Sequence, residues 1–374
     1  MAARYGIVLP LWSYADDDGQ LLERAAGEVG LDHITVPAIT GPQSHFRLGG
    51  ALERPYFQSE GGWHYPPVAK AYGVAGLRPP KARWFGTADH LARLREHLER
   101  LGLKLVLRVD LRPVPALLVQ EPRLCQRNAW GQEVPTAGVC AGDAVARELL
   151  HCTLEDLLRY QPTAYELADW VPDHAVNQHA ARPLAWHAEA RQLLDLCFCP
   201  ACRQAAERAN CDPDQAARSV RVQLERLVGT AAGACDTDVA VAGYIAARSQ
   251  ENLAWLGRLA AADTQRNYDV VHELGQVWPN TERASLGVLF RLARGSAAAD
   301  ADELGLALRW DGWRGGGVSV PVWQPTFAEP AALVRFTSDA VRGGAGAFDF
   351  EGLDEAPPQA MTWLKQAVRF ARRD

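Results

Sequence analysis

The sequence lacks any apolar run close to the ~20 residues needed to cross a bilayer, although 48% of its 374 residues are hydrophobic. It also lacks a block of Lys or Arg, and its formal net charge is -6. A chain without a basic patch is a poor partner for nucleic acid or for anionic membranes. We therefore predict a water-soluble globular protein that binds neither of them.

The N-terminal residues, MAARYGIVLPLW, also lack the features of a secretory signal. They enter a strand-like segment without a basic start, a long apolar stretch or a small-residue cleavage site. We therefore expect a cytoplasmic protein. In that reducing compartment, the eight cysteines predict a metal site rather than a set of disulfides.

Short apolar segments alternate with amphipathic ones, which is typical of repeated βα units around a parallel sheet buried on both faces. The clearest helix has an expected N-cap at Thr87 and ends at Gly102, with leucines at helical spacing between them. We predict an α/β fold, a (β/α)8 TIM barrel, as a single domain over residues 1–374. The eight expected strands are residues 6–11, 33–38, 103–109, 164–168, 268–271, 304–308, 318–322 and 347–350.

The barrel pattern is irregular between the fifth and seventh strands. Only Gly- and Trp-rich residues separate the sixth strand from the seventh, which leaves no room for a helix. Residues 211–262 are mostly helical by pattern, although VAVAGYI (239–245) fits a strand equally well. Long insertions are expected at about residues 39–86 and 112–143, after the second and third strands, and at about 171–212. The first two should lie over the C-terminal face of the barrel, where active sites are built.

Three cysteines lie within six residues in CFCPAC, at Cys197, Cys199 and Cys202. Thiols this close can bind one ion together with a fourth ligand from elsewhere, and a tetrahedral zinc site with four cysteine ligands satisfies that geometry. Nothing in the segment offers an open coordination position, so a structural metal is expected. Buried free thiols and a redox or catalytic cysteine stay open as alternatives. Four further cysteines fit core positions: Cys125, Cys152, Cys211 and Cys235.

Three segments follow one another in a recognisable order: RNAWGQEVPTAGVCAGDAVARELL (127–150), a strand that ends in acidic residues (165–170), and CFCPACR (197–203). Over roughly residues 100–210 the chain resembles the zinc-containing β-galactosidase family and related barrel hydrolases of unassigned specificity. The resemblance implies that Cys140 is the fourth zinc ligand and that the protein is a glycoside hydrolase.

Two positions depart from the pattern of that family. Its general acid is a Glu preceded by Asn, whereas Tyr165 precedes Glu166 here. Its nucleophilic Glu at the seventh strand has no counterpart in VSVPVWQPTF.

Glycoside hydrolysis needs one carboxylic acid to protonate the leaving oxygen and a second carboxylate as nucleophile or base. Acidic residues follow at least five of the eight expected strands, which is more than helix capping requires. We expect Glu166 to be the proton donor, with Asp169 as the alternative. Glu273 and Asp349 are equal choices for the second carboxylate. Taken alone, each of these acids fits helix capping or an ion pair with Arg at least as well.

Ten of the twelve tryptophans fall in segments that follow an expected strand. An indole face can stack on the apolar face of a sugar, and its N–H can donate to a hydroxyl group. Packing inside loops is the alternative role for each of them. Together with polar residues nearby, they give the expected substrate-binding set: Trp12, His64, Arg108, Asp110, Asn128, Trp130, Trp170, His272, Trp310, Asp311 and Trp323.

The sequence thus predicts a glycoside hydrolase that acts on a small oligosaccharide or glycoside and needs no organic cofactor. Two other classes stay open. One is a non-catalytic sugar-binding barrel that has lost its nucleophile. The other is a zinc-dependent hydrolase of a different bond, in which the cysteines are catalytic. The identity of the sugar and the oligomeric state, a homo-oligomer included, also stay open.

Overall fold

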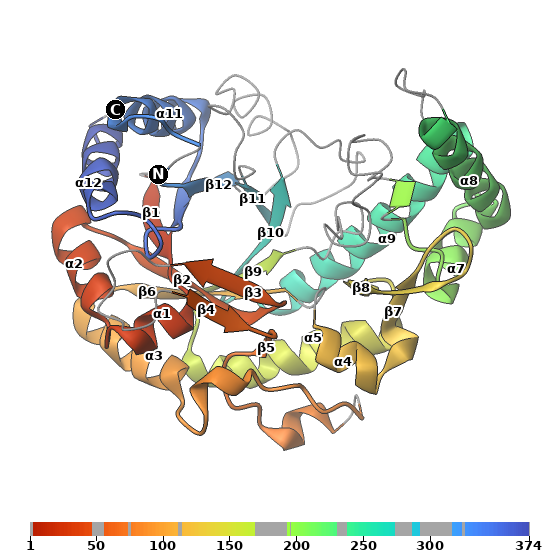
Figure 1. Cartoon of the computed structure of the whole chain (residues 1–374), viewed down its shortest axis with the longest axis horizontal. Helices are drawn as coiled ribbons and strands as arrows, with labels where there is room; N and C mark the ends of the chain where they lie inside the picture. Colours follow the sequence, from red (N-terminus) through yellow and green to blue (C-terminus); the bar gives the residue numbers. More distant parts are fainter. Residues whose placement is uncertain are drawn as a thin grey trace.

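The structure, a computed structural model, describes residues 3–46, 56–73, 76–110, 114–168, 193–194, 196–229, 238–273, 286–291, 316–323 and 326–373. At its centre is a closed barrel of eight parallel strands (Figure 1). The ring closes because the first strand pairs with both the second and the last. In chain order the barrel strands are β1 (Arg4–Val8), β2 (His33–Thr40), β6 (Lys104–Val109), β9 (Ala164–Ala168), β10 (Asn267–Glu273), β11 (Gly287–Arg291), β12 (Gly316–Pro321) and β13 (Ala347–Glu351). The predicted (β/α)8 barrel is therefore confirmed.

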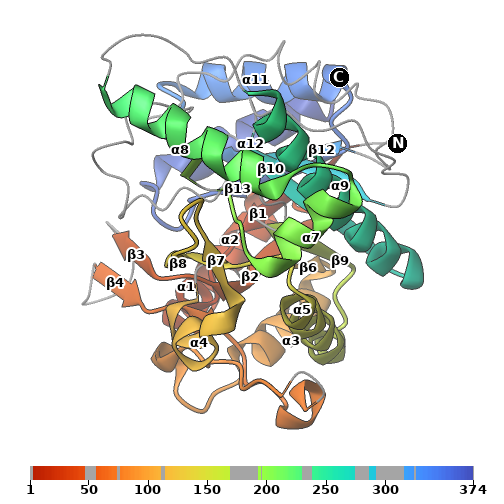
Figure 2. The same ribbon diagram turned by 90° about the vertical axis from the view of Figure 1, so that its right-hand side faces the viewer.

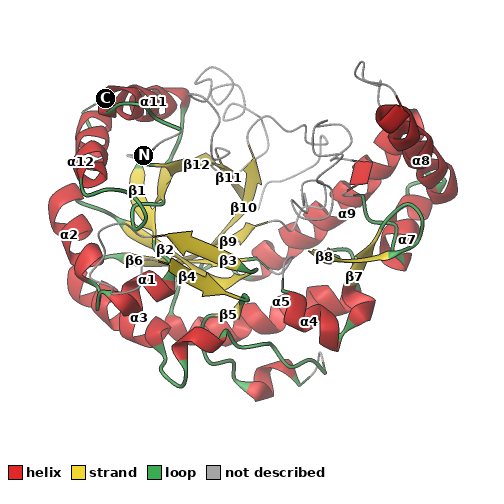
Figure 3. Ribbon diagram, viewed as in Figure 1, coloured by secondary structure: helices red, strands yellow, loops and turns green. Residues whose placement is uncertain are grey.

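Helices cover the outside of the barrel (Figure 3). Their apolar faces and the outward faces of the strands form one continuous core, because a parallel sheet of this kind must be covered. The helices that follow barrel strands are α1 (Leu11–Asp16), α2 (Gln20–Val29), α3 (His90–Leu101), α4 (Pro115–Gln120), α5 (Ala144–Leu157), α11 (Pro330–Gly343) and α12 (Gln359–Ala371). Within the described residues, none of the helices has the length and apolarity that a membrane span requires.

Local sequence explains how these helices start and stop. Asp89 caps α3, since its carboxylate accepts a hydrogen bond from the backbone N–H of Ala92, and Gly102 ends the helix with a φ of 69°. The N-cap is therefore Asp89, and the prediction of Thr87 was two residues too early. A helix that begins after Asp89 gains the hydrogen bond of this carboxylate at its N-terminus. Gly30 ends α2 in the same left-handed conformation.

The sixth barrel strand differs from the prediction. β11 pairs in parallel with both β10 and β12, so residues 287–291 take the place that the sequence pattern assigned to 304–308. Residues 304–308 lie outside the described residues. The apolar run LGVLF (286–290) is short and carries no polar alternation, so its periodicity does not distinguish a buried strand from a helix.

Two insertions lie where the sequence predicts them. β2 is followed by the hairpin β3 (Gln43–Phe46) and β4 (Tyr56–Ser59) and by β5 (Gly62–Trp63), which pairs antiparallel with the end of β2. After β6 come α4 and the hairpin β7 (Cys125–Arg127) and β8 (Glu133–Val139). The hairpin β3–β4 lies in front of the barrel in Figure 1.

Between β9 and β10 the described chain forms α7 (Pro200–Arg208), α8 (Pro213–Gly229) and α9 (Val239–Ala262). Residues 239–245 thus belong to a helix, which settles the ambiguity of VAVAGYI. The three helices pack on one another beside the hairpin β7–β8 (Figures 1 and 2). They share a second core, distinct from that of the barrel, and this core contains four cysteines.

Candidate functional site

The inward faces of several barrel strands carry polar side chains. In β9, Tyr165 and Leu167 belong to the outer core, so the alternation of a strand turns Glu166 toward the barrel interior. In β13, Phe348 and Phe350 point outward in the same way, and Asp349 points inward. The interior of this barrel is therefore partly ionic.

Four of these inward side chains meet in one cluster. The hydroxyl oxygen of Thr35 lies 2.7 Å from Oδ1 of Asp349 and 3.1 Å from Oε1 of Glu166. Nε2 of His33 lies 3.0 Å from the same Oδ1 of Asp349. All four side chains are buried. Two carboxyl groups that sequence reasoning placed on separate strand ends are thus joined through a single hydroxyl.

Arg108 connects this cluster to the C-terminal end of the barrel. Its Nε donates to Glu166 over 2.7 Å, and its Nη1 donates to Glu351 over 2.7 Å. Ser319 also donates to Glu351, over 2.5 Å. Arg108 is only 6% exposed. Its Nη2 is buried and has no hydrogen-bond partner among the described residues.

The two carboxyl groups below Arg108 have opposite pKa shifts. Burial raises the pKa of Glu166 well above its usual 4.5, and the negative charge of Asp349 raises it further, against the opposing effect of Arg108. Burial is the largest single effect on Asp349 and acts to raise its pKa, but its interactions with His33, Glu166 and Arg108 together lower the pKa below its usual value. These opposite directions favour a proton on Glu166 over one on Asp349.

Gly6 leaves the space that this cluster needs. It stands beside both His33 and Asp349 in the register of the barrel, and a Cβ at this position would lie 2.3 Å from Nε2 of His33. Any side chain here would push the imidazole away from Asp349. The glycine is thus explained by a close approach inside the barrel.

We expect Gly6→Ala to destabilise the protein by roughly 1–3 kcal/mol, because a packed interior cannot accept a methyl group without shifting its neighbours. Gly27→Ala is the matched control. Gly27 lies exposed in α2 with nothing within 4 Å of its would-be Cβ, so the same change should add about 0.5–1 kcal/mol of helix stability. Urea unfolding measures both variants. Equal free energies of unfolding for Gly6→Ala and Gly27→Ala would contradict the close approach of His33 to Gly6.

A cavity of about 110 Å³ lies above the cluster. It is lined by residues at or just beyond the C-terminal ends of five barrel strands, where barrel enzymes bind their substrates. Arg108, Ala168 and Glu351 belong to its lining, whereas Glu166 and Asp349 do not. Because Glu166 and Ala168 both point inward from β9, Glu166 lies one layer below the cavity floor.

The rim of the cavity is rich in acids. Asp110, Asp354 and Glu355 line it together with His45 of the hairpin β3–β4. Nδ1 of His45 hydrogen-bonds Glu355, and its ring packs against Trp12, with centroids 5.0 Å apart. The hairpin is thereby fixed to the loop that follows β13.

The residues expected to bind substrate are distributed over three environments. Arg108 and Asp110 line the cavity. Trp12 is buried and stacks on Phe57, with ring centroids 4.4 Å apart. His64 is buried and accepts a hydrogen bond from Trp84, and burial lowers its pKa to about 4. Neither Trp12 nor His64 belongs to the described lining of the cavity.

The remaining predicted binding residues lie elsewhere or are not described. Asn128 and the half-exposed Trp130 form the turn of the hairpin β7–β8, where the Asn128 side chain accepts the backbone N–H of Trp130. Trp323 packs on Trp363 of α12, with centroids 4.1 Å apart. The structure describes only the backbone of two residues in β10, His272 and Glu273. Four predicted residues lie outside the described part of the chain: Asp169, Trp170, Trp310 and Asp311.

Sequence reasoning did not single out two residues of this region, His33 and Thr35. It noted Glu351 only as an acid at the end of the eighth strand and His45 only as a loop histidine that could bind hydroxyl groups. Asp349 and Glu351 alternate at the end of one strand and therefore share its inward face. His33 and Thr35 occur in an otherwise apolar strand, HITVPAIT. Polar residues at alternating positions of a buried strand indicate a polar barrel interior.

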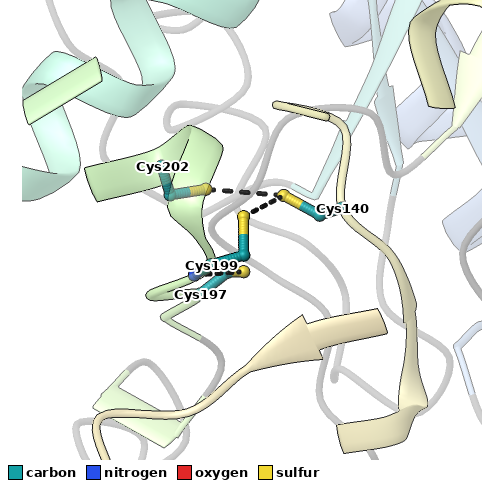
Figure 4. A group of neighbouring side chains, drawn as sticks. All are labelled: Cys140, Cys197, Cys199 and Cys202. Atoms are coloured by element: carbon teal, nitrogen blue, oxygen red, sulfur yellow. Dashed lines mark hydrogen bonds between the residues drawn. The ribbon is translucent and has the colours of Figure 1, made fainter. Parts of the chain in front are cut away.

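The second feature of note is a group of four buried cysteines (Figure 4). The sulfur atoms of Cys140, Cys197, Cys199 and Cys202 all lie within 4.8 Å of one another, and Cys140 lies 3.4 Å from both Cys199 and Cys202. A tetrahedral ion with metal–sulfur bonds of about 2.3 Å separates its sulfurs by about 3.8 Å. The four thiols can therefore bind a metal.

Part of the surroundings of the four cysteines favours thiolates, and the pKa shifts divide the group. Neighbouring thiols lower the pKa of Cys199 and Cys202, whereas hydrogen bonds from neighbouring thiols raise the pKa of Cys140 and burial raises that of Cys197. Backbone N–H groups of Arg127 and Cys199 donate to the sulfur of Cys197, over 3.3 and 3.4 Å. Cys199 caps the N-terminus of α7, where the helix dipole stabilises negative charge. The neighbouring sulfur of Cys140 lowers the pKa of Cys202, and the charge of Arg248 also acts to lower it. Such donors and charges stabilise a metal-bound tetrathiolate.

Comparison with known proteins relates the chain to others by its fold. No protein-family model matches the sequence, and no similar curated protein is found. An α-L-fucosidase from Paenibacillus thiaminolyticus superposes with a TM-score of 0.58 at 12% identity, covering 99% of this chain and 49% of its own. A β-galactosidase from Bacillus circulans sp. alkalophilus gives 0.58 at 11% identity, covering 98% of this chain and 55% of its own.

A β-N-acetylhexosaminidase from Bacteroides fragilis gives a TM-score of 0.54 at 11% identity, covering 98% of this chain and 66% of its own. The chain thus spans about half the length of the first two structures and less than two thirds of the third. At such identities the likeness shows the fold alone: a TIM barrel of the kind that glycoside hydrolases use.

Proposed function

We propose that the chain is a glycoside hydrolase that binds a small glycoside or oligosaccharide in the cavity at the C-terminal end of the barrel. The observation that carries the proposal is Arg108. It lines the cavity, is fixed on two sides by carboxyl groups, and has a buried nitrogen without a partner among the described residues. A buried donor of this kind calls for an acceptor, and a sugar hydroxyl oxygen is one.

For the chemistry we propose Glu351 as nucleophile or base. It lines the cavity, and donors from Arg108 and Ser319 favour its ionised form. Asp110 lines the same cavity and is the first choice for the proton donor. Asp169 and Glu273 stand at the ends of neighbouring strands in sequence and are further proposals for this role. Glu166 and Asp349, one layer lower, are proposed to support Arg108.

Hydrolysis of a panel of aryl glycosides tests the proposal. We expect Glu351→Gln and Asp110→Asn each to lower kcat by roughly 100-fold or more, since general acid and base groups contribute at least that much. Glu60→Gln, which changes an exposed acid paired with Arg83, should leave kcat unchanged. Azide added to a Glu351→Ala variant, which leaves space for it, should restore turnover and give a glycosyl azide, if Glu351 is the nucleophile of a retaining mechanism.

Failure of every glycoside to react would contradict the proposed activity. It would favour the second function, a non-catalytic sugar-binding barrel, for which one observation speaks: no Asp or Glu occurs in residues 316–328, the segment of the seventh strand. Binding of a sugar without turnover would then raise the unfolding temperature of the protein, because a ligand that binds only the folded state stabilises it.

We further propose that the four cysteines bind zinc in a structural role. All four ligand positions of a tetrahedral site are taken by sulfur, which leaves none for a water molecule or substrate. The cluster also belongs to the second core and shares no residue with the lining of the cavity. A catalytic zinc ion would need an open coordination position next to that cavity.

A further inference from the structure

The cluster below the cavity must satisfy its hydrogen bonds internally. His33, Thr35, Glu166 and Asp349 are between 0 and 6% exposed, so bulk water cannot complete their contacts. The distances therefore restrict where the hydrogens between these groups can lie, and Nδ1 of His33 is the one buried polar atom of the four side chains without a partner among the described residues.

Thr35 sets the number of protons in the cluster. Its hydroxyl carries one hydrogen, yet the oxygen faces a carboxyl oxygen of Asp349 at 2.7 Å and one of Glu166 at 3.1 Å. If both carboxyl groups were ionised, Thr35 could donate to only one, and the other would face an oxygen lone pair. One additional proton removes this conflict, because the protonated carboxyl donates to Thr35 while Thr35 donates to the ionised one.

His33 and Arg108 decide which carboxyl carries the proton. Oδ1 of Asp349 receives the hydroxyl of Thr35 and also lies 3.0 Å from Nε2 of His33. With the ring hydrogen of His33 on Nε2, this oxygen accepts two hydrogen bonds, as an anion does. Glu166 then carries the proton on Oε1, and its Oε2 accepts from Nε of Arg108.

The other charged groups around Glu166 favour the same assignment. Glu351 on β13 binds Arg108 from the other side, and Asp269 on β10 stands beside Glu166 in the sheet register. Ser319 on β12 adds only a neutral donor. Four carboxyl groups, those of Glu166, Asp269, Asp349 and Glu351, thus stand against Arg108 and His33. A neutral Glu166 reduces the excess of negative charge.

We infer that Glu166 is a neutral carboxylic acid, held by Thr35 and Asp349, and that this proton-bearing cluster positions Arg108 at the floor of the cavity. A neutral partner at Nε leaves the charge of Arg108 to act on Glu351 and on whatever binds in the cavity. The raised pKa of Glu166 and the lowered pKa of Asp349 have the directions that this assignment requires. The inference does not depend on glycosidase activity.

The raised pKa has a defined consequence for stability. Between the usual value of 4.5 and its raised folded value, Glu166 is protonated in the folded chain and ionised in the unfolded one. Its contribution to stability is therefore complete at low pH and is lost as the pH rises through the folded pKa. A glutamine at this position keeps the neutral shape and cannot ionise. The stability of Glu166→Gln relative to the unchanged protein must therefore increase with pH.

The experiment compares the full-length chain with Glu166→Gln by infrared spectroscopy and thermal unfolding. The carbonyl-stretch band of a buried carboxylic acid should be present in the unchanged protein at neutral pH and absent from Glu166→Gln. Glu96→Gln, at an exposed position of α3, is the control and should keep the band. The difference between the unfolding temperature of Glu166→Gln and that of the unchanged protein should become more positive as the pH rises from about 5 to about 9.

Isotopic labelling tests the assignment even if the variant fails to fold. With 13C in glutamate carboxyl groups the band of the unchanged protein should shift, and with 13C in aspartate it should not. Asp349→Asn, which removes the anion, should unfold at a temperature lower by about 5 °C or more. A missing band, a band that shifts with labelled aspartate, or a Glu166→Gln variant that loses stability as the pH rises would overturn the inference.

Discussion

Purified protein is expected to contain one zinc ion per chain, and removal of this ion by a chelator is expected to unfold the region of α7, α8 and α9. The four sulfurs lie within 4.8 Å of one another in the second core. Without an ion, the metal–sulfur bonds would be lost, and only weak contacts between four buried thiols would remain. Structural zinc in small zinc-finger peptides contributes about 10–16 kcal/mol at neutral pH, so this is the largest single effect that we predict.

Metal analysis and far-UV circular dichroism before and after chelation measure the effect. Cys202→Ser should lose the zinc and the same helical signal, whereas Cys211→Ser, at a half-buried cysteine outside the cluster, should keep both. A chain that is fully stable without metal would exclude a structural zinc ion. Loss of activity on chelation with an intact fold would favour the catalytic alternative.

Arg108→Met is expected to destabilise the protein by about 3–5 kcal/mol, the usual effect of leaving a buried partner charge uncompensated. The change removes the donors to Glu166 and Glu351, which are 2% and 3% exposed. Glu351 should then be held protonated in the folded state, as Glu166 already is in the unchanged protein. The penalty should consequently be smallest at acidic pH and grow as the pH rises.

Chemical unfolding across a pH series measures this penalty. Arg93→Met is the control, because Arg93 pairs with Asp18 at the surface over 2.8 Å with both side chains more than half exposed, and such pairs contribute about 0–1 kcal/mol. Equal losses for the two variants, or a penalty for Arg108→Met that does not change with pH, would contradict the buried charge cluster.

Most of the fold could be predicted from the sequence because the barrel strands are short apolar runs between amphipathic helices. The strand at 164–168 was predicted to the residue, and Gly102 was correctly taken as the end of its helix. The sixth strand was misplaced because LGVLF has no periodicity that separates a strand from a helix. Hydrogen bonds to β10 and β12, which depend on distant residues, fix its position.

The candidate site could be predicted only in part, for a geometric reason. The sequence pattern gives strand ends, but the depth of a side chain within the barrel depends on the register of eight strands. Glu166 and Ala168 are two residues apart on one strand, yet only Ala168 lines the cavity. The contact of Asp349 with His33 joins residues 316 positions apart, which no local pattern reveals. The cysteine cluster was easier, since three of its four members lie within six residues.

The closure of the barrel has a consequence for how this protein is made. β1 pairs with β13, and the charged cluster joins β2 to β13. While a ribosome is still synthesising the middle of the chain, Asp349 does not yet exist, so His33 and Thr35 lack this hydrogen-bond partner. The ionic interior must therefore stay hydrated until residues 347–351 emerge, so its dehydration should be a late step of folding. Contacts so distant in sequence also predict slow folding.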